Sequence, residues 1–323
     1  MDIFTHVAIP LLLGRWLKRS GDEVAALAIG GLAPDLDIFL LPINVIHPNF
    51  FLLVHRGISH SLLFGFLAAL LALRLFCAAP LQPRVSQHLG LNPKFTRRAI
   101  LFAFAGVLIH LALDGLTTQG VPLLFPFDPA RWSAEIFFYT ETPLLLASLG
   151  ILIFEVKMQK IVDHRKMLLL LLLLLAITGS LRLAEKVRAE GVFDDDATAF
   201  PAPNLFEWTV LTEEEGCFGV YGYHALSGEV LFDGNFPKMD IIISQKENFT
   251  EHGLKEALDR AENLPQVKTF RWKAYDVAIS AAFRDGGWDL VYMDPVMAAR
   301  MKDQSSPLKG FFSGLVFLDV RVE

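Results

Sequence analysis

Two histidines, one arginine and two serines lie within seven residues in the stretch HRGISHS, residues 55–61. A strongly apolar run follows it directly. Ionisable side chains are costly near the interior of a membrane, and where they occur they usually mark a functional site. Other residues of these types occupy the predicted ends of apolar segments: His6, Asp35, Asp37, His110 and Asp114.

Imidazole and carboxylate groups are the ligands that zinc, manganese and similar divalent ions accept. With His55 and His60, the set offers more ligands than one tetrahedral ion needs. Two ions about 3.5 to 4 Å apart would use them, and such a pair can hold the attacking and leaving oxygens of a phosphoester. Arg56 has the planar donors that suit a phosphate, and Ser59 or Ser61 could donate hydrogen bonds to a substrate.

Each of these residues also has an ordinary structural explanation. A single histidine near a helix end, such as His6, is more often hydrogen-bonded than a ligand. Asp35 and Asp37 could cap a turn, and Arg56 could contact lipid headgroups. His110 and Asp114 are one helical turn apart, which also suits a structural pair. The gathering of all seven at one membrane face favours a metal site more than any single residue does.

The composition indicates a membrane protein. Of 323 residues, 53% are hydrophobic, and the mean hydropathy is +0.42. Formal net charge is +4 over residues 1–184 and −10 over residues 185–323, so we predict two different domains. The two cysteines are too few to predict a disulfide framework. The N-terminus lacks the pattern of a cleaved signal peptide. No basic patch predicts binding to nucleic acid.

About five to six transmembrane helices are predicted in the first domain. Four apolar stretches, residues 59–79, 98–116, 136–156 and 166–184, approach the length that crosses a bilayer. Two others are less regular: residues 3–17 are short and contain Pro10, and residues 23–42 contain Pro34 and two aspartates. Lysine and arginine gather in alternate loops, which places those loops in the cytoplasm. The His and Asp residues and the C-terminal domain are then predicted outside the cytoplasm.

The second half is predicted to be a soluble α+β domain, residues 206–323. An acidic, proline-containing linker is predicted over residues 185–205. Alternating apolar runs predict strands, and the amphipathic stretch EHGLKEALDRAEN predicts a helix. The strand predictions are FEWTVLT, CFGVYGYHAL, TFRWKAYDVAIS, WDLVYM and GLVFLDVRV.

These residues together resemble a known family. An early histidine, PDLD, HRGISHS and HLALDGLTTQGVPLLFP, in this order, are similar to the YdjM-like membrane-bound metal-dependent hydrolases of bacteria and archaea. The resemblance covers about residues 1–185, and the ending FLDVRV looks like the extra domain of a subset of that family. It implies a metal cluster with Arg56 and Ser61 beside it, formed by His6, Asp35, Asp37, His55, His60, His110 and Asp114. The opening motifs also look like those of zinc-dependent phospholipases C.

The resemblance and the site logic predict an inner membrane hydrolase that acts on a phosphoester, with a membrane lipid as substrate. A metal-activated water would attack phosphorus, Arg56 would neutralise charge, and Asp37 or Asp114 would carry the proton. One alternative is a non-catalytic, metal-stabilised scaffold or sensor whose outer domain binds a partner; another is an ion carrier. HLALD also resembles one element of vanadium-haloperoxidase-like phosphatases, but the accompanying Pro-Ser-Gly-His element is missing.

Overall fold

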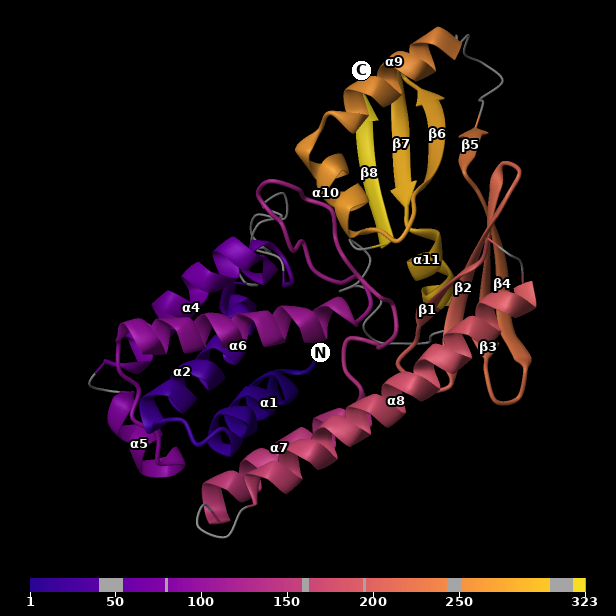
Figure 1. Ribbon diagram of the computed structural model, residues 1–323. Helices are drawn as coiled ribbons and strands as arrows, with labels where there is room; N and C mark the ends of the chain where they lie inside the picture. The colour runs from indigo at the N-terminus through magenta and orange to yellow at the C-terminus, as the bar shows by residue number, and fades with distance from the viewer. Residues whose placement is uncertain are drawn as a thin grey trace. The chain divides into compact units, whose positions relative to one another are not determined.

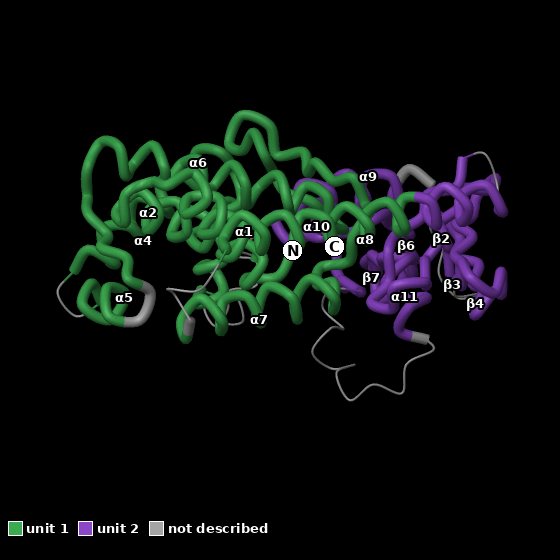
Figure 2. Tube along the Cα trace, turned by 60° about the horizontal axis from the view of Figure 1, so that its bottom comes forward, with its two compact units in different colours: residues 1–183 green, residues 184–323 purple. Residues whose placement is uncertain are grey.

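The computed structural model describes residues 1–40, 55–78, 81–158, 163–193, 196–242, 251–302 and 316–322. The chain divides into two compact units, Met1–Leu183 and Ala184–Glu323 (Figures 1 and 2). The first unit is helical, and the second contains two β-sheets covered by helices. Much of the loop predicted outside the membrane, residues 43–58, lies outside the described residues.

The first unit is built from helices. In chain order they are α1 (Ile3–Trp16), α2 (Gly21–Leu32), the 3-10 helices η1 (Pro34–Leu40) and η3 (Ile58–His60), α4 (Leu62–Phe76), α5 (Gln82–Leu89), α6 (Arg97–Gly115), α7 (Thr142–Met158) and α8 (His164–Phe193). One apolar core joins α2, α4 and α6. A second joins α1, α6, α7 and α8.

Glycines allow α1, α2 and α6 to approach one another closely (Figure 1). A Cβ added at Gly30 would lie 1.9 Å from the carbonyl oxygen of Ala103 on α6, and one added at Gly106 would lie 2.2 Å from that of Leu27 on α2. A Cβ at Gly31 would lie 2.3 Å from the carbonyl oxygen of His6 on α1. Small residues at such crossings let backbones pack directly, as is common between membrane helices.

Two helices of the described part of the chain, α6 and α8, are long and apolar enough to cross a membrane. Helices α1 and α4 are apolar but have 14 and 15 residues. At 1.5 Å per residue they are about 22 Å long, shorter than the roughly 30 Å of a bilayer core. The predicted helical character of this domain is therefore confirmed, whereas the predicted number of crossings is not.

Local sequence explains why two predicted segments differ from the observed helices. Residues 23–42 are divided because α2 ends at Leu32 and Pro34 starts the 3-10 helix η1. The segment predicted to begin at residue 136 begins as a helix at Thr142, followed by Pro143 in the first turn. The residues before it are held in an irregular loop by the β-bridge between Thr117 and Phe137.

The second unit contains two four-stranded sheets (Figure 1). Antiparallel neighbours form the first in the order β1 (Thr198–Pro201), β2 (Glu207–Glu214), β3 (Cys217–His224) and β4 (Glu229–Pro237). The second runs β5 (Met239–Ile242), β6 (Ala278–Arg284), β7 (Gly287–Met293) and β8 (Phe317–Val322), with β5 parallel to β6. Its core is formed with helices α9 (Glu251–Glu262) and α10 (Pro265–Lys273), while α11 (Pro295–Lys302) packs on the first sheet.

Two predictions for this half are corrected by the structure. Residues 185–193, predicted as linker, continue α8, because Ala189 and Glu185 of that helix pack with Trp208 in the core of the second unit. The stretch TFRWKAYDVAIS, predicted as one strand, begins in α10, and strand β6 starts at Ala278. Pro265 presets the first turn of that helix, and Val267 and Phe270 are buried on one helical face.

Candidate metal centre

The seven predicted residues come from four segments of the first unit and lie together. Helix α1 supplies His6, and η1 supplies Asp35 and Asp37. The turn ending in η3 supplies His55 and His60, while α6 supplies the last two, His110 and Asp114. Close packing of α1, α2 and α6 at their glycines is what allows these segments to meet.

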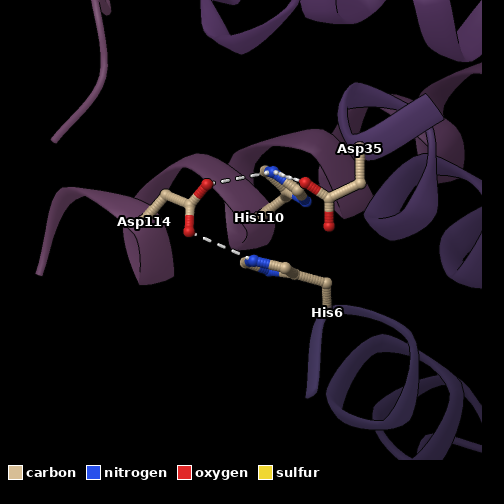
Figure 3. A group of neighbouring side chains, drawn as sticks. All are labelled: His6, Asp35, His110 and Asp114. Carbon is tan, nitrogen blue, oxygen red and sulfur yellow. Dashed lines mark hydrogen bonds and ion pairs between the residues drawn. The ribbon is translucent and has the colours of Figure 1, made fainter. Parts of the chain in front are cut away.

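Four fully buried or nearly buried side chains form what we call the inner group: His6, Asp35, His110 and Asp114 (Figure 3). One ligand atom from each lies within 4.8 Å of the others. Nε2 of His110 lies 3.4 Å from Asp114 Oδ2 and 3.7 Å from Asp35 Oδ1. Nε2 of His6 lies 3.2 Å from Asp114 Oδ1, and its ring stacks on that of His110 with centroids 3.8 Å apart. The amino group of Met1 also contacts Asp114.

A backbone carbonyl sets the orientation of His110. Its Nδ1 lies 2.7 Å from the carbonyl oxygen of Gly31. A carbonyl can only accept, so Nδ1 carries the hydrogen and Nε2 of the neutral ring presents its lone pair to the carboxylates. Metal-binding histidines are commonly held in this way, because the outer hydrogen bond fixes both the tautomer and the ring plane.

A second set, the outer group, consists of Asp35, His55 and His60. It shares Asp35 with the inner group, but its exposure differs, since the side chain of His55 is 40% exposed and that of His60 is buried. Nε2 of His60 lies 3.4 Å from both Asp35 Oδ1 and Asp114 Oδ2. The outer group therefore connects the buried carboxylates to the protein surface.

Asp37 lies beside the outer group and contacts the far nitrogens of its histidines. Its carboxylate lies 2.7 Å from Nδ1 of His55 and 3.2 Å from Nδ1 of His60. It also accepts hydrogen bonds from Ser59 Oγ, at 2.6 Å, and from the backbone N–H of Arg56. These contacts leave Nε2 of His55 and of His60 available to bind a metal ion. Asp37 is therefore better placed to orient these two histidines than to bind the metal itself.

Arg56 is buried against the same cluster, with a left-handed backbone (φ 61°) that turns its side chain inward. Its guanidinium donates to Asp114 Oδ1 at 3.0 Å and to Thr117 Oγ1 at 2.6 Å. The ring of Tyr139 lies 5.0 Å from the guanidinium carbon. Within the described residues, Arg56 Nε has no hydrogen-bond partner, so a donor remains for an anionic ligand.

The polar atoms at the centre lack the partners that buried groups normally have. In the described part of the chain, His6 Nδ1, His60 Nε2, His110 Nε2 and Asp114 Oδ2 are buried without a hydrogen bond. Such groups are rare in folded proteins and call for an explanation. The cluster also contains three carboxylates, against the guanidinium of Arg56 and the amino group of Met1. Lone pairs and negative charge directed to one buried place fit a divalent cation well.

The YdjM inner membrane protein family matches residues 1–189. The chain belongs to this family. It is also 33% identical over 141 residues to the inner membrane protein YbcI of Escherichia coli strain K12, an alignment covering 42% of this chain and 70% of that protein. No solved structure matches the chain. Family membership places the protein in the inner membrane.

The part of the chain that matches the YdjM family contains every residue of both groups. The two β-sheets of the second unit lie beyond it. The candidate metal centre therefore belongs to the shared family portion.

Several residues of the site were not predicted from the sequence. The sequence patterns indicate no function for Thr117, Tyr139 or the carbonyl of Gly31. Thr117 follows Asp114 by about one helical turn, and its Oγ1 donates to the carbonyl oxygen of Asp114 at 2.8 Å. Ser61, predicted beside the metal, instead caps α4: its Oγ accepts from Phe64 N and donates to Ile58 O. No local pattern indicates Tyr139, because its contact with Arg56 depends on the tertiary fold.

Proposed function

We propose that the first unit is a membrane-bound, metal-dependent hydrolase of phosphoesters. The observation that supports it most is the gathering of four buried ligand atoms that have no hydrogen-bond partner among the described residues. Beside them lies Arg56, whose Nε also has none in that part of the chain. The inner and outer groups would hold zinc or manganese. A bound divalent ion supplies Lewis acidity and lowers the pKa of a water toward neutrality. Arg56 then binds a phosphate oxygen through Nε while Asp114 and Thr117 keep its guanidinium in place.

Of the two carboxylates predicted to carry the proton, we assign the role to Asp37. Asp114 is fully buried, whereas Asp37 lies 2.7 Å from the half-exposed ring of His55. Proton transfer is favoured near solvent, and Asp37 is the one of the two carboxylates that lies beside an exposed side chain. Asp114 remains a ligand and a partner of Arg56.

Apolar surface beside the site supports a lipid as substrate. Ile38 and Phe39, next to Asp37 on η1, are 50% and 75% exposed. On α4, which begins two residues after His60, four exposed leucines at every fourth position form one stripe: Leu63, Leu67, Leu71 and Leu75. A substrate whose headgroup enters the site could keep its acyl chains against this surface.

We further propose that α1, α4, α7 and the segment of α2 with η1 complete the membrane domain with α6 and α8, giving six crossings. Arginine and lysine in the loops at residues 15–19, 84–98 and 157–166 then face the cytoplasm. The site and the second unit face the other side.

The test combines metal analysis with turnover in the detergent-purified full chain. Elemental analysis should find a divalent metal that His60→Ala loses and that His224→Ala, a histidine of the second unit, retains. Hydrolysis of phospholipid vesicles or of an aryl phosphodiester should then require the metal and fall at least 100-fold in Arg56→Ala. Stoichiometric metal without turnover of either substrate would instead favour a metal-stabilised scaffold or sensor, for which the enclosed inner group is suited.

A further inference from the structure

The two ligand groups differ in ligand number and in access to solvent, while one carboxylate belongs to both. The inner group has four members, all buried, and the outer group has three, including the exposed His55. Closed four-ligand sets are typical of tightly held ions, and three-ligand sets leave a position open for water or substrate. The two groups are therefore suited to different tasks.

Asp35 is the residue that joins them. Its Oδ1 lies 3.4 Å from His60 Nε2, of the outer group, and 3.7 Å from His110 Nε2, of the inner group. A carboxylate has two oxygens with about four lone pairs, so Asp35 has the capacity to be shared by two ions. Asp114 Oδ2 is also 3.4 Å from both of these nitrogens.

We infer that the site holds two divalent ions with unequal exchange: a slowly exchanging ion in the inner group and a rapidly exchanging one in the outer group, with Asp35 between them. This inference rests on the proposed function and specifies it, because the outer ion would be the one that meets water and substrate. The inner ion would hold α1, η1 and α6 together. Asp37 acts on the outer ion by orienting His55 and His60.

The charges around the site are consistent with two ions and an anionic substrate. With neutral histidines, Asp35, Asp37 and Asp114 carry three negative charges, while the guanidinium of Arg56 and the amino group of Met1 carry two positive ones. One divalent ion changes this net charge of −1 to +1. A second makes the site strongly positive, and a phosphate group beside Arg56 would offset part of that charge.

The experiment measures metal per chain during chelator treatment of the reconstituted full-length protein. We expect two ions in the wild type, released in two phases. His55→Ala should hold one ion, released at the rate of the slow phase, and His55→Gln checks that truncation has not disturbed the fold. Asp35→Asn should weaken the binding of both ions, and His224→Ala should leave both release phases unchanged.

A spectroscopic measurement gives an independent test. In the manganese-loaded wild type, two neighbouring ions should give a magnetically coupled paramagnetic resonance spectrum, and His55→Ala should give that of an isolated ion. One ion in the wild type, a single release phase, or two ions retained by His55→Ala would each overturn the two-ion inference and leave the metal-dependent function standing. A wild-type protein that binds no metal after reconstitution would overturn both.

Discussion

Ser59 and Ser61 are two positions apart and contact different parts of the structure. Ser59 Oγ donates to Asp37 at 2.6 Å, and Ser61 Oγ caps the first turn of α4. Both are serines beside a histidine, so the sequence alone does not distinguish their roles. The structure does, because one hydroxyl meets a carboxylate and the other meets the backbone.

The two serines therefore provide a matched pair of variants. Ser59→Ala should lower metal affinity by up to about tenfold by loosening Asp37 and its histidines. Ser61→Ala should leave that affinity unchanged and lower stability by about 1 kcal/mol through loss of the cap. Chelator competition and thermal unfolding of each variant measure the two effects. The reverse pattern would show that Ser61 serves the metal site, as the resemblance to the family implied.

Asp294 gives a residue-scale prediction in the second unit. It is 1% exposed, and burial raises its pKa to about 6, although its carboxylate accepts hydrogen bonds from Tyr275 N and Met297 N. A folded-state pKa above the unfolded value stabilises the folded protein most at low pH. This contribution is complete below about pH 4 and is lost as the pH rises through about 6, a change of about 3 kcal/mol.

Thermal unfolding of the full chain between pH 4 and pH 7 measures this contribution. Asp294→Asn, which cannot titrate, should flatten the pH dependence relative to the wild type. Asp259→Asn, at an exposed position on α9, should keep the wild-type slope. An Asp294→Asn slope equal to that of the wild type would contradict the raised pKa.

At the scale of elements, the approach of α2 and α6 determines whether the site can form. Gly30→Ala places a methyl group against the backbone of Ala103, so the helices must separate. We expect the free energy of unfolding to fall by about 2 kcal/mol or more. Metal binding should also weaken, because Asp35 follows α2 and His110 lies on α6. Gly150→Ala on α7, where an added Cβ meets no atom of the described residues within 4 Å, is the control and should leave both unchanged. Thermal unfolding and metal content check the pair.

The elements also show what sequence patterns can predict. Apolar runs located α4, α6 and α8 because such runs have few other folds available in a membrane protein. Helix lengths were less predictable, since Pro34 and the loop before Thr142 shorten segments whose hydropathy continues. Alternation predicted β2, β3 and β7 correctly. It placed the end of α10 in a strand because Phe270, Trp272 and Ala274 alternate with Arg271 and Lys273.

At the scale of the whole molecule, the proposed membrane topology predicts that the second unit lies outside the cytoplasm. Within the first unit, Gly179 packs against Phe137, and Arg182 donates to Glu141 at 2.9 Å. Phe137 accepts a hydrogen bond from Thr118, next to the Thr117 that binds Arg56. The C-terminal part of α8 therefore lies at the site end of the first unit.

Cysteine labelling in intact cells tests this placement. In a chain lacking Cys77 and Cys217, a cysteine introduced at Glu215, in the exposed turn between β2 and β3, should react with a membrane-impermeant maleimide once the outer membrane is permeabilised. A cysteine at Arg84 on α5 should react only after the inner membrane is also opened. Protection at Glu215 in intact inner membranes would place the second unit in the cytoplasm.

The site was predictable as a set of residues and not as an arrangement. The membrane topology predicted from the sequence places His6, Asp35, Asp37, His55, His60, His110 and Asp114 at one face of the membrane. Their division into two groups depends on side-chain directions, such as the hydrogen bond from His110 to the carbonyl of Gly31. The contact of Asp37 with Nδ1 of the two histidines likewise depends on the direction that the 3-10 helix η1 gives to each carboxylate. Residue spacing in the sequence does not predict that direction.

The unpartnered atoms at the centre have a consequence for how this sequence can diverge. A chain that loses one ligand keeps the other buried polar atoms, now with a weaker ion or none, and each uncompensated group costs on the order of 1–3 kcal/mol. Single losses should therefore be selected against even in descendants that no longer need the activity. We expect natural variants to contain either the complete set or a centre that has become apolar throughout, and intermediate sets to be rare.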